Sequence, residues 1–512
     1  MAPPPSGLRA VCLVVPLFCF VSPARAQLIP IKTIPIAQGD QFQIFPSNNL
    51  GMGGVSIALP DSLGDPFANP ATTARLRASR FFSAPTVYSV SGHAGGGRSL
   101  PFAMLVRRAN WYGGLALALQ EVDASRPPQQ NPVVWVAVEP LVPPGGPPNP
   151  GPDMRAHANQ YALGMVGRSW EASHLSIGAS ALWTGLHALD GVDLLYSGSL
   201  RVKQTGHAID FRVGALKEWP SDRGARSLEA IVLHNRFAAT HDVLYADQFW
   251  DPGLQQFVTH LRTDQNFDHT NTWGAQLEYQ MPLASPGWRI GWIATINRAT
   301  HPKLPNYDIT NVAVIPWDPG RSYAYNLGVG LSKVLGSATF GVDAMYEPIR
   351  SYTWADAIAP TVTLGGDTIA AGGKTVENRF TFSNAVFRMG VGRDIVLEGS
   401  PKVGLQFGLM VRSINYRLQQ ADHVELTQRA LHTGWFEWTP TWGLTLRFPE
   451  LELRYRGRVT KGAGRPGFGQ FSVGVRDLAF SSGTILAAPN GPLSLVDVNT
   501  ATHQISLSLP IH

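Results

Sequence analysis

The sequence predicts an all-β fold and, within that class, a transmembrane antiparallel β-barrel that follows a cleaved export signal. Three observations carry this prediction. The N-terminus has the form of a signal peptide, most of the remaining chain alternates apolar and polar residues with a period of two, and short and long connections follow one another in turn.

Composition excludes several classes of protein. Of the 512 residues 15% are charged and 44% are hydrophobic, and the mean hydropathy is -0.03. Charge is therefore well below the roughly 25% of an ordinary soluble domain, and a disordered chain is not expected. The net charge is +5 with Lys and Arg scattered, so we expect no nucleic-acid partner. Beyond the N-terminus no run reaches the roughly 18 apolar residues of a membrane helix.

The export signal is expected to occupy residues 1–26. Arg9 precedes an apolar segment from Val11 to Val21, and Ala24-Arg25-Ala26 forms a cleavage site of the A-x-A type. The two cysteines, Cys12 and Cys19, lie within this segment. We therefore expect an exported protein without disulfides or Cys-ligated metal, and cleavage after Ala26 rather than lipidation of Cys19.

Alternation is clearest in two hairpins. Apolar residues occupy every second position from Tyr323 to Leu331, and the pattern returns after a tight turn from Phe340 to Tyr346. A second hairpin alternates from Phe436 to Phe448, turns at Pro449-Glu450 and continues to Val459. Similar segments lie near residues 111 to 121, 159 to 167, 174 to 184, 207 to 216, 272 to 282, 287 to 297, 402 to 412, 469 to 476 and 503 to 511.

A soluble sandwich or propeller also alternates, but three features favour a membrane barrel over residues 79–512. The polar face is rich in Gly, Ser, Thr and Asn, as a hydrated lumen would be, and Trp and Tyr lie near segment ends, as in interfacial girdles. Short connections near 109, 171, 284, 335 and 449 separate long ones at about 123–156, 238–270, 300–320, 350–377 and 419–433. We therefore expect a Gram-negative outer-membrane location with membrane lipid as a partner. The segment count of about 14 to 18 leaves the strand number open.

A distinctive segment, residues 27–78, lies between the signal and the first strand. It contains Asn49-Leu50-Gly51-Met52-Gly53-Gly54-Val55-Ser56-Ile57-Ala58-Leu59-Pro60-Asp61-Ser62, followed by Asn69-Pro70-Ala71. In order and spacing it resembles the opening of the FadL/TodX family of outer-membrane hydrophobic-compound transporters, including PorV-type relatives.

The resemblance implies a barrel of about 14 strands, for which 16 is the alternative, with residues 27–78 folded into the lumen as a hatch. The ligand path would pass the hatch at Leu50, Gly51, Met52, Gly53, Gly54, Asp61, Asn69, Pro70 and Ala71. A plug that only closes and stabilises the lumen is the competing interpretation.

The sequence contains no motif that predicts an enzyme, a cofactor or a metal site. Residues 462–467 match G-x-G-x-x-G, but Pro466 and Gly467 prevent the helix that would bind a pyrophosphate, so a loop is expected. The 14 histidines show no ligand-spaced pair on one strand face. An outer-membrane hydrolase would need a Ser and a His together on one face, which the sequence does not establish.

Three arginines, Arg454, Arg456 and Arg458, share the polar face of the second hairpin. Pairing Phe448 with Leu451 places Arg447 opposite Glu452 and leaves those three opposite Thr445, Gly443 and Thr441. Their counterions would come from a neighbouring strand, from a ligand or from hatch carboxylates such as Asp61 and Asp65, and the last of these is favoured over an anion site.

A change of parity marks the segment 402–418. Apolar residues from Val403 to Val411 share one face, whereas Ile414, Tyr416 and Leu418 take the other. We therefore predict a β-bulge near Arg412-Ser413, which would return the later residues to the outside. The preceding segment shows the same switch between Phe382 and Ala385. The family resemblance implies a lateral route at such a kink, and a bulge that only shapes the rim is the alternative.

Two functions follow as hypotheses. The first is a passive outer-membrane channel for hydrophobic or amphipathic small molecules such as long-chain fatty acids or hydrocarbons. The second is a PorV-type scaffold or secretion accessory that binds an exported protein partner through its long loops. The sequence does not name the substrate.

Overall fold

The structure is a computed structural model. It describes residues 28–29, 32, 35, 37, 41, 44–45, 49–59, 65–92, 94–123, 157–190, 201–222, 224–251, 253–300, 320–357, 359–396, 402–466 and 495–511. The predicted export signal, Asp61 and the alternating segment predicted near residues 469 to 476 lie outside these residues. Within them, no helix combines the length and the apolar character needed to cross a membrane.

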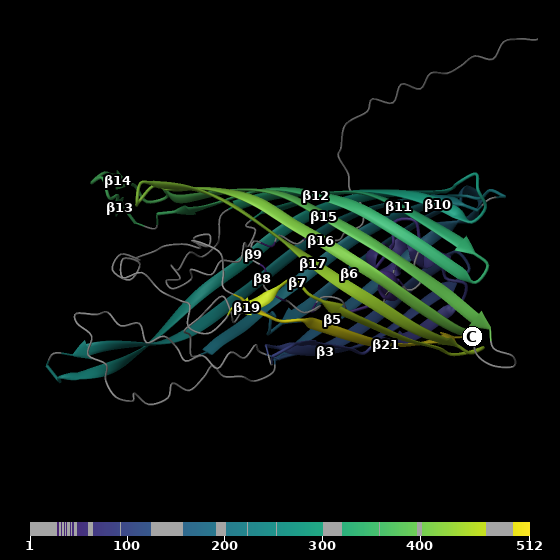
Figure 1. Cartoon of the computed structure of the whole chain (residues 1–512), viewed down its shortest axis with the longest axis horizontal. Helices are drawn as coiled ribbons and strands as arrows, with labels where there is room; N and C mark the ends of the chain where they lie inside the picture. Colours follow the sequence, from purple (N-terminus) through teal and green to yellow (C-terminus); the bar gives the residue numbers. More distant parts are fainter. Residues whose placement is uncertain are drawn as a thin grey trace, which may run out of the picture.

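The described chain forms a closed antiparallel β-barrel of tilted strands (Figure 1). Seventeen strands belong to one sheet. They are β1 (Ser79–Ser83), β2 (Thr86–Val90), β3 (Gly96–Arg108), β4 (Trp111–Asp123), β5 (His157–Trp170), β6 (Leu175–Leu186), β7 (Arg201–Trp219), β8 (Arg226–Asp251), β9 (Gln256–Pro282), β10 (Trp288–Thr300), β11 (Gly320–Leu335), β12 (Ala338–Asp356), β15 (Lys374–Val396), β16 (Lys402–Asp422), β17 (Thr427–Arg447), β18 (Glu452–Thr460) and β21 (Thr500–Ile511).

The ring closes through β21, which pairs with β18 on one side and with β1 and β2 on the other. Both β1 and β2 also pair with β3, so they share one place in the wall. The described strands therefore occupy 17 − 1 = 16 positions. This all-β barrel agrees with the predicted fold class, and its count matches the alternative of 16 strands rather than the 14 that the family resemblance implies.

Smaller elements complete the description. Two short antiparallel pairs join β13 (Thr361–Val362) to β14 (Thr368–Ile369) and β19 (Gly464–Pro466) to β20 (Leu495–Asp497). The described helices are short: η1 (Leu50–Met52), α1 (Asp65–Ala68), η2 (Pro70–Arg75) and η3 (Glu171–Ser173).

The two faces of the wall differ in the way that the alternation predicts. On β4, Leu115 and Leu117 are 71% and 64% exposed, whereas Ala116 between them is 2% exposed. On β11, Leu327 lies outside and Asn326 is buried. Successive side chains of a strand point to opposite faces, so the large exposed apolar residues form the outer surface of the barrel. An apolar outer surface and a more polar interior are typical of a barrel that faces lipid.

Short turns lie at one end of the barrel, together with the C-terminus (Figure 1, right). We call this the short-turn end; its turns span residues 109–110, 171–174, 283–287, 336–337 and 448–451. At the opposite end the prediction of long loops was partly wrong. Residues 238–270, for example, belong mostly to β8 and β9, which have 26 and 27 residues and stay paired up to Asp251 and Gln256. Beyond the lipid-facing belt polar and apolar residues no longer alternate regularly, as at Val243-Leu244 and Phe249-Trp250, so pairing continues where the alternating pattern has ended.

The predicted β-bulge in β16 was wrong. Phe382 pairs with Tyr416 and Ala385 pairs with Ser413 in one unshifted register, and the pairing of β16 with β17 is also continuous. The ladder is interrupted only locally, where the Asn415 backbone N–H donates to Asn384 Oδ1 at 3.2 Å. The apolar residues after position 413 therefore face the lumen and are not returned to the lipid.

Candidate functional site in the barrel lumen

The N-terminal residues that precede β1 contact inward-facing side chains of the wall. The Gly53 N–H donates to Thr441 Oγ1 on β17 at 2.8 Å, and the Ser56 N–H donates to Asp343 Oδ2 on β12 at 2.7 Å. Ser332 Oγ on β11 donates to the Ala58 carbonyl at 2.7 Å. Residues 53–58 are thus hydrogen-bonded to three strands, although more than 270 positions separate the partners in the sequence.

Inward glycines of the wall make room for this segment. A Cβ atom at Gly390 would lie 2.4 Å from the Met52 carbonyl oxygen, and one at Gly341 would lie 2.6 Å from Val55 Cγ1. Real Cβ contacts are longer than 3.0 Å, so any larger residue at these positions would displace the segment. The alternating pattern predicts glycines as part of a hydrated lumen; in the structure these glycines also let two backbones approach closely.

The Asn69-Pro70-Ala71 element begins η2. Asn69 Oδ1 accepts from the Ala71 N–H at 3.1 Å, while Asn69 Nδ2 donates to Glu229 Oε2 on β8 at 3.1 Å. Pro70 occupies the first helical position, where a missing N–H costs nothing. A Cβ atom at Gly214 on β7 would lie 2.0 Å from Asn69 Oδ1, so this element also needs an inward glycine.

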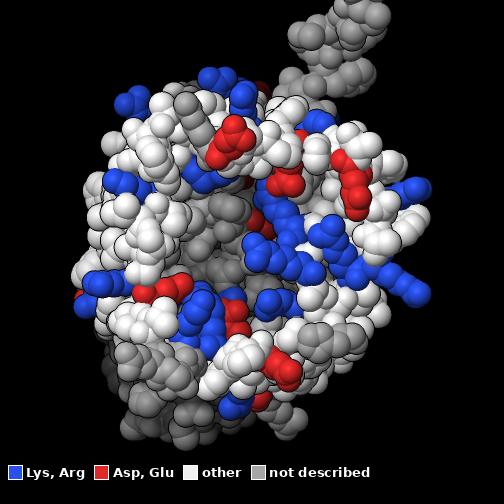
Figure 2. Space-filling view, turned by 90° about the vertical axis from the view of Figure 1, so that its right-hand side faces the viewer, with Lys and Arg blue, Asp and Glu red and all other residues white. Residues whose placement is uncertain are grey.

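Arginines hold the end of the segment at the wall. Arg75 forms ion pairs with Glu218 on β7 at 3.0 Å and with Glu229 on β8 at 2.8 Å. Arg107 on β3 donates to the carbonyls of Ala74 and Leu76 at 2.6 and 2.8 Å. Seen from the short-turn end, Lys and Arg side chains surround a central hollow with fewer acidic side chains among them (Figure 2).

A charged pair joins the start of the described segment to the wall further from the short turns. Lys32 Nζ contacts the Glu437 carboxylate on β17, which also accepts from Trp435 Nε1 at 3.1 Å. Burial lowers the pKa of Lys32, and the neighbouring carboxylate opposes this effect. Arg412 on β16 pairs with Glu347 on β12 at 3.4 Å. These four charged side chains of the lumen are therefore paired.

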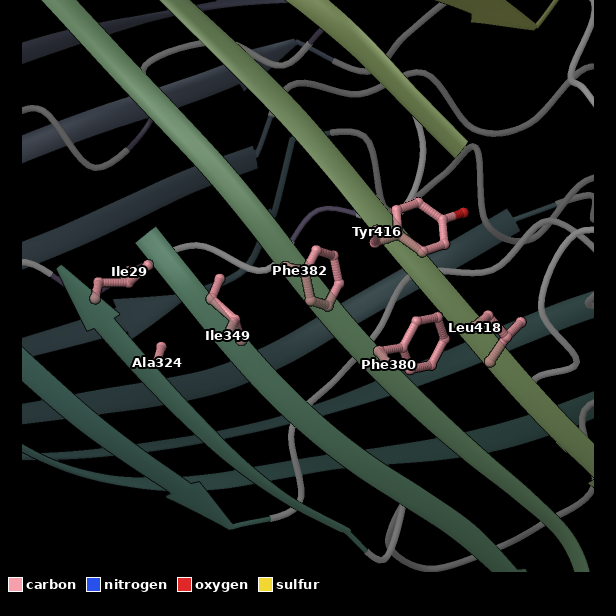
Figure 3. Packing of buried hydrophobic residues seen from close by; sticks show 7 residues of the cluster. All are labelled: Ile29, Ala324, Ile349, Phe380, Phe382, Tyr416 and Leu418. Atoms are coloured by element: carbon pink, nitrogen blue, oxygen red, sulfur yellow. The ribbon is translucent and has the colours of Figure 1, made fainter. Parts of the chain in front are cut away.

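Next to the charged level, the inner wall is apolar. Figure 3 shows side chains of β12, β15 and β16 lying close together, with Ile29 of the N-terminal segment beside them. The Phe382 and Tyr416 rings have centroids 5.3 Å apart, and those of Phe380 and Phe382 are 6.0 Å apart. We call this group the lumen patch, and it comprises Ile29, Ala324, Ile349, Phe380, Phe382, Tyr416 and Leu418.

Sequence reasoning missed the lumen patch as a site. The parity change at Ile414 was the signal, but it was attributed to a bulge because apolar residues were assumed to face lipid. The interior of a water-filled barrel is usually polar, so the buried apolar clusters on the inner wall, of which the lumen patch is one, are unusual features of this lumen.

The hairpin around Pro449 pairs in the predicted register. Arg447 lies opposite Glu452, and Arg454, Arg456 and Arg458 lie opposite Thr445, Gly443 and Thr441. The carboxylate that Arg454 contacts is Glu452 of its own strand, at 2.6 Å, which replaces the expected partner from the hatch. Arg456 donates to Thr445 Oγ1 at 3.0 Å and to the Leu444 carbonyl at 3.0 Å.

The remaining sequence motifs add no site. Gly464 lies in β19 and exchanges backbone hydrogen bonds with the N-terminal segment, accepting from Ala37 and donating to Pro35. The described part of the G-x-G-x-x-G match therefore ends in a strand, and its last glycine lies outside the described residues. Across the described ranges, no group of three His, Cys, Asp or Glu side chains is placed to hold a metal ion.

No family model matches the chain, and no curated protein matches it in sequence. Solved structures with a similar fold include a Pseudomonas aeruginosa FadL homologue, which is 10% identical with a TM-score of 0.42, covering 94% of this chain and 100% of that one. The Ralstonia pickettii toluene transporter TbuX is 11% identical with a TM-score of 0.35, covering 92% and 100%. A bacterial polysaccharide outer membrane secretin is 6% identical with a TM-score of 0.36, covering 85% and 99%. These likenesses concern the barrel fold alone.

Proposed function

We propose that this protein is an outer-membrane channel for the passive uptake of hydrophobic or amphipathic small molecules, such as long-chain fatty acids or hydrocarbons. The lumen patch is the observation that carries the proposal. Phe380, Phe382 and Leu418 project inward from the wall and are at most 5% exposed, so a solute would reach them only when the residues that cover them move aside. Aromatic and aliphatic side chains inside a barrel would provide an apolar solute with a favourable surface that a polar pore lacks.

The N-terminal segment is the hatch in this proposal. Its contacts with Thr441, Asp343 and Glu229 come from separate parts of the ring, which supports a segment that crosses the lumen. The residues that would then border the path are Leu50, Gly51, Met52, Gly53, Gly54, Asn69, Pro70 and Ala71, together with Asp61, which lies outside the described residues. Solutes would move down their own gradient, because no motif for energy coupling occurs in the sequence.

The arginine strip of β18 has a structural role in this proposal. Arg454 contacts Glu452, and Arg456 contacts a carbonyl and a hydroxyl of β17. These contacts hold Arg454 and Arg456 against their own hairpin, which favours internal bracing of the wall over a dedicated anion site.

Uptake into proteoliposomes tests the function. Vesicles containing the full-length protein should take up a labelled long-chain fatty acid or a labelled hydrocarbon faster than protein-free vesicles do. A labelled sugar of similar size is the control and should enter much more slowly. Equal rates for the sugar and the hydrocarbon would indicate a general pore, and rates equal to those of empty vesicles would overturn the proposal.

A scaffold for an exported protein is the second candidate, and one observation favours it. The β8–β9 ribbon extends beyond its neighbours, since β7 pairs with β8 only to Leu244 and β10 pairs with β9 only to Asn271. The paired strands 245–251 and 256–262 thus project from the wall (Figure 1). Removing residues 245–262 should abolish capture of an exported protein if the barrel is a scaffold, and should leave uptake unchanged if it is a channel.

A further inference from the structure

A row of basic residues crosses the outside of the barrel near the end opposite the short turns. Arg298 on β10 pairs with Tyr323, which pairs in turn with Arg350 on β12. Arg350 pairs with Thr381, and Thr381 pairs with Arg417 on β16. All three arginines are exposed on the outer surface. Directly paired residues lie side by side, so these arginines face the same side of the wall at one level.

A second row lies next to the first, further from the short turns. Arg321 on β11 pairs with Tyr352 on β12, and Tyr352 pairs with Arg379 on β15. Three cations approach the Tyr352 ring, with Arg321, Lys374 and Arg379 at 5.7, 5.1 and 5.6 Å from its centroid. Lys374 also lies 5.4 Å from the Trp354 centroid. Aromatic rings thus fix the cations on the outer surface.

We call these residues the basic face, and they are Arg298, Arg321, Arg350, Lys374, Arg379 and Arg417. Two carboxylates lie among them: Glu377, which pairs with Lys374 at 2.9 Å and Arg379 at 3.6 Å, and Asp356, the register partner of Lys374. The face therefore carries a net charge of 6 − 2 = +4. Elsewhere on the outside of the wall, Arg98 on β3 is balanced by Glu121 at 2.6 Å.

The basic face borders the lipid-facing belt. Towards the short turns the same strands present exposed apolar and aromatic side chains, including Tyr325, Leu327 and Tyr346. Arginines and aromatic rings at the edge of such a belt lie at the level of lipid headgroups. With the long connections outside the cell, this level belongs to the outer leaflet.

We propose that the basic face binds the phosphate groups of an outer-leaflet lipid, a phosphorylated glycolipid of the lipopolysaccharide type. One guanidinium group can donate two parallel hydrogen bonds to two oxygens of a phosphate. Adjacent strands of the basic face place several guanidinium groups within reach of one lipid headgroup. The acyl chains of the same lipid would lie on the apolar belt beside Leu327. That continuity favours a lipid over free phosphate as the source of the anion. The inference rests on the outer-membrane orientation of the proposed function and does not depend on transport.

Binding of fluorescent lipopolysaccharide to the detergent-purified protein tests this inference. The variant R321Q/R350Q/R379Q should bind about 100-fold more weakly, since each basic residue at an anionic membrane surface contributes about fivefold. The matched control is Lys333→Gln, which removes a cation that lies 4.9 Å from the Trp288 centroid at the short-turn end. This control should bind within about twofold of wild type, because removing one distant charge changes the field at the basic face little.

Further arms separate the alternatives. Dephosphorylated lipopolysaccharide should bind at least tenfold more weakly than lipopolysaccharide. If inorganic phosphate binds as tightly as lipopolysaccharide, the proposal that a lipid supplies the bound phosphate is overturned. Unchanged affinity in the triple variant would overturn the basic face as the site. If the triple variant fails to show heat-modifiable migration, the single Arg350→Gln variant, with an expected loss of about fivefold, decides instead. Lipid binding without solute uptake would refute the channel and leave this inference intact.

Discussion

The backbone of Gly53 lies so close to Gly408 on β16 that a Cβ atom at position 408 would be 2.2 Å from the Gly53 nitrogen. The N-terminal segment and the wall are therefore fitted to each other at the level of the main chain. Gly53 has a positive φ of 71°, a backbone conformation that favours glycine. Gly53 and Gly408 therefore both need to lack a side chain for this contact to form.

Replacing Gly408 with Val should displace the segment and raise the conductance of the barrel in planar bilayers. The control is Gly164→Val on the outer face of β5, where the nearest atom to a new Cβ, Leu115 Cδ2, would be 3.8 Å away. The control should keep wild-type conductance. Equal conductance of both variants would show that the contact at Gly408 does not limit the pore.

Deletion of residues 27–76 should leave a barrel that still assembles, because the ring closes through strands that begin at Ser79. The deletion removes the contacts of Asn69 and Arg75 with the wall, so the pore should change from closed to open. Single-channel recording measures this change, and heat-modifiable migration on gels reports assembly. If the barrel without residues 27–76 keeps the wild-type conductance, another part of the protein closes the pore.

Because the apolar face is assigned to the lipid side, an arginine placed on it should reduce the free energy of unfolding by an amount that depends on its depth in the membrane. Leu327→Arg, in the middle of β11, should reduce the free energy of unfolding by roughly 2–4 kcal/mol. Leu335→Arg, at the last residue of the same strand, should cost only about 0–1 kcal/mol. Urea unfolding in lipid vesicles measures both, and similar costs would contradict the assignment.

The lumen patch predicts a selective loss of uptake. Phe382→Ala removes a ring from the patch and should slow the uptake of an apolar solute several-fold. Phe387→Ala makes the same change on the outer face of the same strand, where the ring is exposed, and should leave uptake near the wild-type rate. If both variants transport equally well, the patch is not part of the path.

The contact between Lys32 and Glu437 predicts non-additive effects. Lys32→Met leaves a buried carboxylate without its cation, and removing one partner of a buried pair costs roughly 3–5 kcal/mol. The N-terminal segment should therefore become more accessible to a protease. The double variant Lys32→Met with Glu437→Gln should be cut less readily than Lys32→Met alone. Additive effects in this cycle would mean that the two side chains are not coupled.

Some features of this protein could be predicted from local sequence because they depend on neighbouring residues. The alternation around Leu327 assigns faces directly, since side chains of a strand point in turn to opposite sides. The register of β17 with β18 was also predicted, because the short turn at Pro449 allows only one pairing of Arg447 with Glu452. The ends of β8 and β9 were not predicted, because polar and apolar residues do not alternate regularly there.

Local sequence was sufficient to predict the fold class, the two faces of the wall and the register across the turn at Pro449. Contacts between residues far apart in the sequence set how the ring closes and which glycines face the N-terminal segment, and they turn Ile414, Tyr416 and Leu418 inward without a bulge. Local periodicity reports only on residues that are close in the sequence. An apolar side chain is satisfied equally by lipid outside the wall or by Ile29 and Phe382 inside it, and local periodicity cannot distinguish these surroundings.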